Sequence, residues 1–499
     1  MTIPIVRTWT RPLDRSVIFR HHSFMKLHLT RDSSVPLYLQ IVQRITDLIG
    51  EGALTPGTRL PTVRRMSQDE GLGRMTVQTA YAELQARGWI ESVVGRGTFV
   101  AERVQAQDLP QAISPRVEVP GSLAALLEPQ APMARLVLGQ VAPAEETYPI
   151  KNFKACIGVA LNRVAHLSYG SVLGEEALRV QISRLLRTRG LTVSSESVVI
   201  SSGAQQAIEL VIRTLTTPDQ SVAVEAPVYP GVLEVLASRR QRILEVPVEE
   251  DGLSLVQLEK LVRRDRPALL YTVPTFQNPT GTVTTTEHRR ALLKMAEKHD
   301  FYILEDDVYG HLSFDQPAPP CLKSLDTTGR VVYVTSFSKS LMPALRLGAV
   351  IATPGQLAAF TQKKQTADLV SSSVMQQALA EFLQRGYYKA HLQRVQSLYK
   401  ERRDTACQTV ADVLPTVRFQ RPQGGLSMWL QLPPESDEAD LFLQARKRGL
   451  VVARGEPFFA RPQPRGFLRL SFASVSRPKF RQAANTLAEL LKEQRRVRG

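Results

Sequence analysis

Short apolar runs alternate with helical stretches over residues 149–495, and this alternation restricts the fold more than any other feature of the chain. The runs span 197–200, 221–224, 268–273, 302–304 and 331–334. Strands of a parallel sheet are buried on both faces and form continuous apolar runs, and the helices that connect them cover the sheet. We therefore expect an α/β domain in which a mainly parallel sheet lies between two layers of helices.

Residues 35–103 show a different pattern. Apolar residues at three- and four-residue spacing predict three helices, and two β-like runs then flank a turn that contains glycine. The predicted helices span 36–50, 62–70 and 75–87, and the β-like runs span 89–92 and 98–101. Three helices followed by a hairpin predict a winged helix-turn-helix domain.

Two further segments lack a regular period. The first 24 residues are rich in Arg and His, and we expect residues 1–34 to be either a disordered arm or the product of a start codon set too far upstream. Residues 104–148 are rich in Pro, Ala and Gln, which predicts a linker with one short helix at 122–127.

Composition excludes several classes of protein. The chain has 499 residues, of which 43% are hydrophobic and 22% charged, as in folded proteins with two or three domains. No apolar run approaches the ~20 residues of a membrane-spanning helix, and no secretory signal is recognisable, so we expect a cytoplasmic protein. The three cysteines lie far apart and predict neither a disulfide framework nor a metal site. A net charge of +16 favours polyanionic partners.

The helix-turn-helix carries polar residues where a DNA-reading unit needs them. Its later helix enters the major groove of double-stranded DNA, while the wing contacts phosphate or the minor groove. The candidate DNA-binding residues are Arg64, Arg65, Arg74, Thr76, Gln78, Thr79 and Arg96.

The motifs at 60–64, 74–77 and 95–100, with Leu84 and Gly88, resemble the DNA-binding domain of GntR-type bacterial regulators over about residues 36–101. This resemblance implies that Arg64, Arg74, Thr76 and Gly97 contact operator DNA. Leu72 and Gly73 replace the Val-Ser pair that usually precedes the arginine.

The richest chemical signal is a lysine flanked by hydroxyl groups. Lys339 follows Ser336 and Ser338 and precedes Arg346, which suits a Schiff base beside a phosphate pocket. Asp306 ends an apolar run, where its carboxylate can pair with a pyridinium nitrogen. The turn Gly203-Ala204-Gln205 follows another run and opens a helix, so its free amides form a seat for an anion. Tyr229 suits stacking on a planar ring, and Asn278 offers an amide to a ring oxygen; either could equally be ordinary packing.

Together these motifs resemble the fold-type I pyridoxal-phosphate enzymes of the aspartate aminotransferase superfamily over about residues 149–493. The resemblance implies a bound pyridoxal 5'-phosphate and a small C-terminal α+β subdomain. It implies an internal aldimine at Lys339, a pyridine nitrogen paired with Asp306 and a ring hydroxyl bonded to Asn278 and Tyr309. It also implies a ring stacked on Tyr229 and a substrate carboxylate held by Arg469, with Asn278 also at the substrate. The implied phosphate ligands are Gly203, Ala204, Gln205, Ser336, Ser338, Arg346 and, from the partner subunit of a homodimer, the residue equivalent to Tyr169.

Two stretches depart from the superfamily pattern. The motif around Tyr169 lacks the usual proline, which weakens the assignment of Tyr169. Residues 454–459 lack the usual Pro-Gly opening, so we expect a different substrate wall there.

A GntR-like reader joined to an aminotransferase-like domain resembles the MocR-type regulators. We therefore expect a pyridoxal-phosphate-dependent transcriptional regulator that senses the cofactor or an amino compound through an aldimine. The resemblance also implies a head-to-tail homodimer, which can be domain-swapped, on a double-stranded operator. The alternative is a working aminotransferase of the aromatic or 2-aminoadipate type, because a sensor and an enzyme need the same residues.

Overall fold

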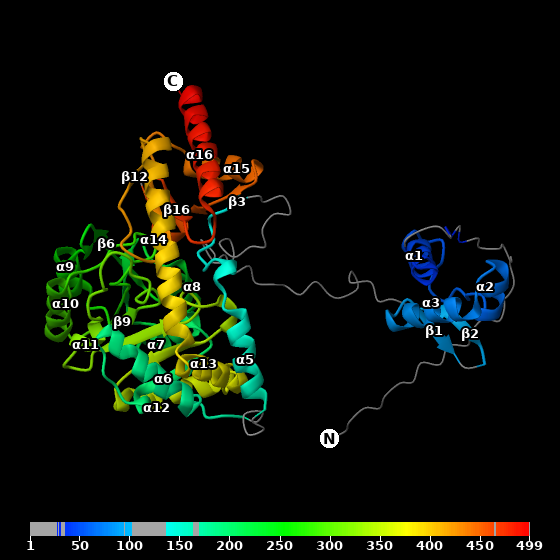
Figure 1. The fold of residues 1–499 in the computed structure, drawn as a ribbon, viewed down its shortest axis with the longest axis horizontal. Coiled ribbons are helices and arrows are strands. Elements are labelled where there is room, and N and C mark those ends of the chain that lie inside the picture. The colour runs from blue at the N-terminus through cyan, green and yellow to red at the C-terminus, as the bar shows by residue number, and fades with distance from the viewer. Residues whose placement is uncertain are drawn as a thin grey trace, which may run out of the picture. The chain divides into compact units, whose positions relative to one another are not determined.

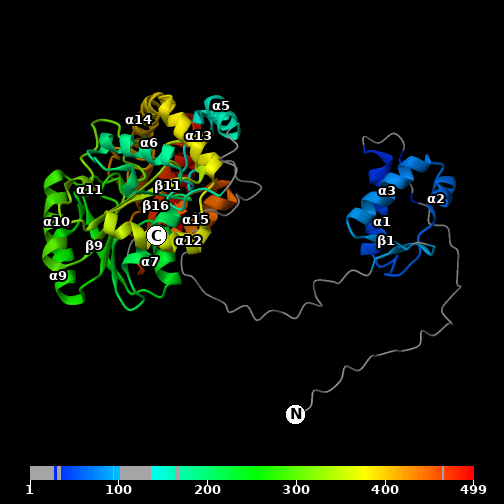
Figure 2. The same cartoon turned by 90° about the horizontal axis from the view of Figure 1, so that it is seen from below.

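The computed structural model describes residues 27, 29–30, 35–93, 95–101, 136–162, 169–463 and 466–498. The chain divides into two compact units, Met1–Val117 and Glu118–Gly499 (Figures 1 and 2). Most of the predicted arm and linker, with the short helix expected at 122–127, lies outside the described residues.

The N-terminal unit is the predicted winged helix-turn-helix. Its elements are α1 (Leu37–Gly50), α2 (Val63–Asp69), α3 (Arg74–Ala86), β1 (Ile90–Val93) and β2 (Gly97–Val100). Thr62 begins α2 by accepting a hydrogen bond from the amide of Arg65 at 3.3 Å, as N-cap threonines do. The two strands pair antiparallel from Ile90 opposite Val100 to the wing.

A small apolar core holds this unit together. Ile41, Ile45, Val77 and Leu84 from α1 and α3 are almost fully buried in it. Leu27 is also buried there, and its amide donates to Glu70 Oε1 at 3.0 Å. The core of the unit therefore includes a residue that precedes the predicted domain boundary at 35. The sequence did not predict this contact, because a single apolar side chain leaves no periodic pattern.

The C-terminal unit is built on an eight-stranded sheet. The strand order is β4 (Val198–Ser201), β11 (Gly348–Ile351), β10 (Val331–Ser336), β9 (Tyr302–Asp306), β8 (Leu269–Thr272), β5 (Val222–Ala226), β6 (Ile243–Glu249) and β7 (Gly252–Leu253). The pairs from β10 through β9, β8 and β5 to β6 are parallel, whereas β11 is antiparallel to both neighbours and β7 is antiparallel to β6. This confirms the expected mainly parallel sheet.

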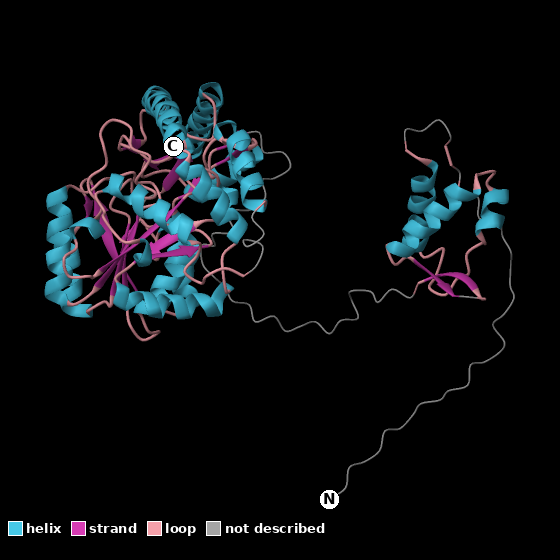
Figure 3. Ribbon diagram, turned by 60° about the horizontal axis from the view of Figure 1, so that its bottom comes forward, coloured by secondary structure: helices cyan, strands magenta, loops and turns pink. Residues whose placement is uncertain are grey.

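Helices cover both faces of the sheet (Figure 3). Because side chains alternate between the faces of a strand, Val332 and Val334 of β10 pack in one layer and Tyr333 in the other. One layer contains α7 (Ala204–Leu215), α8 (Pro230–Ser238) and α12 (Pro354–Asp368). The other contains α5 (Ile150–Leu161), α6 (Glu176–Leu186), α9 (Leu255–Asp265), α10 (Thr286–His299), α11 (Leu322–Leu325) and α13 (Ser373–Gln384).

A smaller α+β subdomain follows, as expected. The long helix α14 (Tyr387–Val413) leads into it, as Figure 1 shows. Its elements are the antiparallel strands β12 (Arg418–Phe419), β13 (Ser427–Gln431), β16 (Phe467–Ser471) and β15 (Ala453–Arg454), the pair β14 (Leu450–Val451) and β3 (Leu136–Val137), and the helices α15 (Glu438–Lys447) and α16 (Arg477–Arg498). Among the helices of the described ranges, none has the length and apolar composition needed to cross a bilayer.

Candidate functional site

The predicted cofactor residues surround one cavity of about 410 Å³. It lies where β4, β5, β8, β9 and β10 end, which is the edge at which ligands bind in sheets of this kind. The lining residues are Gln140, Val141, Ala142, Ala204, Gln205, Tyr229, Tyr271, Val273, Asn278, Asp306, Val308, Tyr309, Ser336, Ser338, Lys339, Pro343, Arg346 and Arg469. Of the cofactor and substrate residues expected from the sequence, only Gly203 and Tyr169 are not in this lining.

Hydrogen-bond donors suited to a phosphate group line part of the cavity wall. Gly203 precedes α7 with φ 91°, a conformation that other residues rarely adopt, and a Cβ there would lie 2.8 Å from Arg346 Nη2. The Ser338 hydroxyl is buried and has no hydrogen-bond partner among the described residues. Free amides at the start of a helix, an arginine and an unpaired hydroxyl together fit a phosphate group.

Asp306 and Lys339 carry opposite charges in the same cavity. Burial raises the pKa of Asp306 to about 6, although hydrogen bonds from Tyr271 and from the amide of Val308 act in the opposite direction. Desolvation, and then the nearby Arg469 and Arg346 cations, lower the pKa of Lys339 to about 8. The amine donates to the carbonyl oxygen of Val141 at 2.6 Å. A buried carboxylate and an amine that loses its proton more readily than an exposed lysine thus line the same cavity as the hydrogen-bond donors.

Three further predicted residues complete the wall. Tyr229 donates its hydroxyl to Gln205 Oε1 at 3.1 Å, which fixes its ring beside the start of α7. Tyr309 is buried. Asn278 Oδ1 accepts from Arg469 Nη1 at 3.1 Å.

Arg469 is a buried cation with unused donor capacity. Its Nη2 donates to the carbonyl oxygen of Gly139 at 2.9 Å, its guanidinium carbon lies 4.8 Å from the Phe458 ring centroid, and its Nε has no partner in the described part of the chain. Burial lowers the pKa of Arg469 to about 10. A guanidinium held this way can donate hydrogen bonds to the carboxylate of a ligand.

Sequence reasoning missed two parts of this cavity. Tyr271 lies inside an apolar run and reads as a core residue, yet its hydroxyl is bonded to Asp306. Gly139 and Val141 fall in the segment expected to be a linker, and they act through backbone carbonyls that leave no side-chain signal. Tyr169 is 86% exposed, so within one chain it contributes nothing to the cavity.

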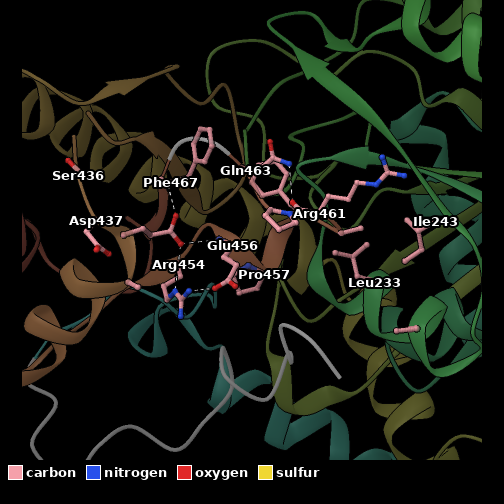
Figure 4. A pocket seen from close by; sticks show the side chains of 17 residues that line it. Leu233, Ile243, Ser436, Asp437, Arg454, Glu456, Pro457, Arg461, Gln463 and Phe467 are labelled. Carbon is pink, nitrogen blue, oxygen red and sulfur yellow. Dashed lines mark hydrogen bonds and ion pairs between the residues drawn. The ribbon is translucent and has the colours of Figure 1, made fainter. Parts of the chain in front are cut away.

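A second cleft of about 610 Å³ lies between α8 and β6 on one side and α15 with residues 454–463 on the other (Figure 4). In Figure 4, Glu456 and Arg454 point toward each other, and they form an ion pair. Four residues of the stretch expected to alter the substrate wall line this cleft, namely Arg454, Glu456, Pro457 and Phe459. Phe458, from the same stretch, instead reaches Arg469.

The predicted DNA residues lie in the first turn of α2, in the first half of α3 and on the wing. Arg74, Gln78 and Thr79 are exposed at the start of α3, and Thr76 is half-buried beside them. Arg64 is exposed in the first turn of α2, and Arg96 at the tip of the wing. Gly97 has φ 118°, and a Cβ there would lie 2.9 Å from Arg59 Nε. The Thr79 hydroxyl donates to the carbonyl oxygen of Met75 at 2.9 Å.

Comparisons with known proteins agree with this architecture. Residues 144–487 match the family described as aminotransferase class I and II, and residues 37–100 match the bacterial regulatory proteins of the gntR family. The chain is 34% identical to the HTH-type transcriptional regulator TauR of Rhodobacter capsulatus, over 90% of this chain and 95% of TauR. It is 30% identical to the probable rhizopine catabolism regulatory protein MocR of Rhizobium meliloti, over 92% and 95%. The chain is a MocR-type member of the GntR family.

A solved structure supports the cofactor of this MocR-type regulator. The α-aminoadipate aminotransferase LysN of Thermus thermophilus, in complex with N-(5'-phosphopyridoxyl)-L-leucine, matches with a TM-score of 0.70 and 31% identity over 74% of this chain and 94% of LysN. The cofactor of the MocR-type regulator is pyridoxal phosphate, and the unpaired Ser338 hydroxyl in the cavity and the Gly203 turn beside Arg346 fit the phosphate. The GntR-type unit is a DNA-binding domain, and the aminotransferase fold is typically dimeric.

The lowered pKa of Lys339 leads to a first prediction. Only the neutral amine attaches to the aldehyde of pyridoxal phosphate, so the attachment rate should rise with pH and level off above a midpoint near 8, instead of near 10.5 for an exposed lysine. Stopped-flow absorption of cofactor-free protein mixed with pyridoxal phosphate measures this rate. Lys339→Ala serves as the control, and a wild-type midpoint near 10 would show that the cavity does not lower the lysine pKa.

Proposed function

We propose that the regulator binds a double-stranded operator as a homodimer, and that an amino compound with a carboxylate alters its DNA affinity by entering the pyridoxal-phosphate cavity. One observation carries this proposal: residues 139–141 contact both Lys339 and Arg469 and are continuous with the chain that leads to the DNA-binding unit. We call residues 136–141 the strap. The proposed site of action is the cytoplasm, where bacterial DNA lies.

The strap is part of the small subdomain. Its β3 pairs in parallel with β14, and the amides of Leu138 and Gly139 both donate to the carbonyl oxygen of Val451. The carbonyl oxygen of Leu138 accepts from the amide of Ser471 at 2.7 Å. A Cβ on Gly139 would lie 2.8 Å from the carbonyl carbon of Val452, so the strap backbone packs directly against the backbone of Val452 with no room for a side chain between them. A displacement of the strap would therefore move the point from which the linker departs.

A ligand carboxylate would compete with the strap for Arg469. The guanidinium that donates to the Gly139 carbonyl is the group that would bind the carboxylate, and the Lys339 amine that donates to the Val141 carbonyl is the group that attaches to the cofactor. A ligand shifts an equilibrium only by its difference in affinity for two states, typically about 1–3 kcal/mol of coupling. The cofactor would displace the Lys339 contact with the strap, and loss of the remaining Arg469 contact when the ligand binds would supply such a difference.

The assigned roles follow from where each side chain lies. Bound pyridoxal phosphate supplies an aldehyde that attaches to amines and a ring that withdraws electrons. Asp306 would keep the pyridine nitrogen protonated, Tyr309 and Asn278 would orient the ring hydroxyl, and Tyr229 would stack on the ring. The phosphate would be held by Gly203, Ala204, Gln205, Ser336, Ser338 and Arg346.

The exposed Tyr169 supports a second subunit at the site. A large aromatic side chain that is 86% exposed in one chain is typical of an interface that another chain covers. We propose that it reaches the partner's phosphate pocket in a homodimer, which can be domain-swapped. Sedimentation of the purified protein tests the dimer.

Transamination is a second candidate function. The complete set of cofactor residues and the similarity to LysN favour it. Visible absorption of the holo-protein, titrated with single amino compounds and followed by a keto-acid assay, separates the two functions. A spectral shift that persists without keto acid supports the sensor, whereas cycling upon addition of a keto acid supports the enzyme; Lys339→Ala is the control.

The DNA surface leads to a prediction about Arg74. Arg74→Ala should weaken operator binding about tenfold and lower the slope of log affinity against log salt by about 1, because an arginine contact at the start of α3 is lost. Fluorescence anisotropy on a DNA site selected from random sequences measures both quantities. Arg87→Ala, at the other end of the same helix, is the matched control and should change affinity less than twofold. Equal losses for the two variants would contradict the assignment.

Arg469 should decide which amines are sensed. Arg469→Gln should keep the cofactor band but weaken the response to amino carboxylates about 100-fold, because two charge-assisted hydrogen bonds are lost. The response is the midpoint of the absorption titration. Arg454→Gln, in the second cleft, should retain the wild-type midpoint. An unchanged midpoint for Arg469→Gln would remove the carboxylate from the proposal.

The strap should couple effector binding to DNA affinity. Gly139→Ala forces the strap away from Val452, so the ratio of DNA affinities with and without the effector should move toward 1 while the cofactor band remains. Gly158→Ala in α5, where a Cβ meets nothing within 4 Å, is the matched control. A full effector response in Gly139→Ala would exclude the strap as the route.

A further inference from the structure

A tyrosine on the neighbouring strand donates a hydrogen bond to Asp306, the carboxylate proposed to pair with the pyridine nitrogen of the cofactor. β8 and β9 are parallel, and Tyr271 lies opposite Leu304, two residues before Asp306. The Tyr271 hydroxyl donates to Asp306 Oδ2 at 2.7 Å, and the tyrosine is fully buried. Tyr271 also lines the cavity, so this bond is made at the wall of the cofactor site.

The Asp306 carboxylate is held through both oxygens. Oδ2 accepts from Tyr271, and Oδ1 accepts from the amide of Val308 at 3.3 Å. The bond to the amide is long, whereas the bond to the hydroxyl has the length of a strong hydrogen bond. The tyrosine is therefore the stronger of the two constraints on the carboxylate plane.

The same hydroxyl favours the charged form of the carboxylate. Burial raises the pKa of Asp306, and the hydrogen bond from Tyr271 lowers it. Burial, and then the negative charge of Asp306, raise the pKa of Tyr271 well above its usual value, so the phenol remains a donor. Other titratable groups that act on Asp306 or respond to it are Glu225, Tyr229, Asp307, Tyr309 and Lys339.

We propose that Tyr271 is a positioning residue that keeps Asp306 ionised and fixes the oxygen that faces the pyridine nitrogen of pyridoxal phosphate. This inference rests on the cofactor site of the proposed function and on none of its DNA or effector steps. Without the hydroxyl, desolvation would favour the neutral acid, which cannot form an ion pair with a protonated pyridine.

The neighbouring strand provides a matched control. Tyr333 of β10 is fully buried, and its hydroxyl donates to Asp307 Oδ2 at 2.7 Å. Asp307 also accepts from Arg189 Nε at 2.8 Å, and it does not line the cavity. Tyr333→Phe thus removes the same chemical group, from a bond of the same length, to the next carboxylate along the chain.

The experiment measures cofactor affinity of the full chain with pyridoxal phosphate alone. We expect Tyr271→Phe to raise the dissociation constant for pyridoxal phosphate at least about tenfold at pH 7.5, and Tyr333→Phe to change it less than about twofold. As the pH falls from 8 to 6, Tyr271→Phe should lose affinity at a higher pH than wild type, because the pKa of its Asp306 is higher. Thermal unfolding of the cofactor-free proteins shows whether the two variants lose similar stability.

A double-mutant cycle separates positioning from a general loss of structure. In an Asp306→Asn background, Tyr271→Phe should weaken cofactor binding by no further factor, because the carboxylate on which it acts is gone. Equal affinities for Tyr271→Phe and wild type, equal losses for the two tyrosine variants, or an undiminished loss in the Asp306→Asn background would each overturn the proposal. Because neither DNA nor an amine is present, these outcomes are independent of whether the regulator senses an effector.

Discussion

Charges of opposite sign line one cavity, and the arrangement of the C-terminal unit depends on hydrogen-bond partners that compensate the desolvation of these charges. An unpaired charge removed from water costs several kcal/mol. Asp306 is therefore paired with donors from two segments, while Lys339 and Arg469 donate to carbonyl oxygens of the strap. The charged groups and their partners come from the large sheet, from β16 of the small subdomain and from the strap. The cavity is complete only when all three have assembled, so cofactor binding reports on the folding of the whole unit.

The sheet could be predicted where burial leaves a local signature. β8, β9 and β10 are buried on both faces, so their sequences are continuous apolar runs. β6 has mixed burial and contains charged residues, and β11 is antiparallel both to β10, which directly precedes it, and to β4, which lies far earlier in the sequence. Their positions are decided by long-range pairing, which no local pattern encodes.

The cofactor site could be predicted to the extent that its residues act through side chains in recognisable motifs. Lys339, Asp306 and Arg346 stand at strand ends in such motifs, and the fold brings them to one cavity. Tyr271 could not be found this way, because a tyrosine within a buried strand is indistinguishable from a packing residue until its neighbour is known. Leu27 was similarly invisible, since its burial depends on a core assembled from three later helices.

The strap contacts the cavity through peptide carbonyls, and this has a consequence for divergence among related regulators. Substitutions at position 141 alter a side chain but leave its carbonyl oxygen in place, so the contact with Lys339 can persist while the cavity wall changes. Gly139 is the exception, because Val452 leaves no room for a side chain. Side-chain substitutions can thus change the ligand that the cavity binds, while the main-chain contacts of the strap, which leads to the DNA-binding unit, stay the same.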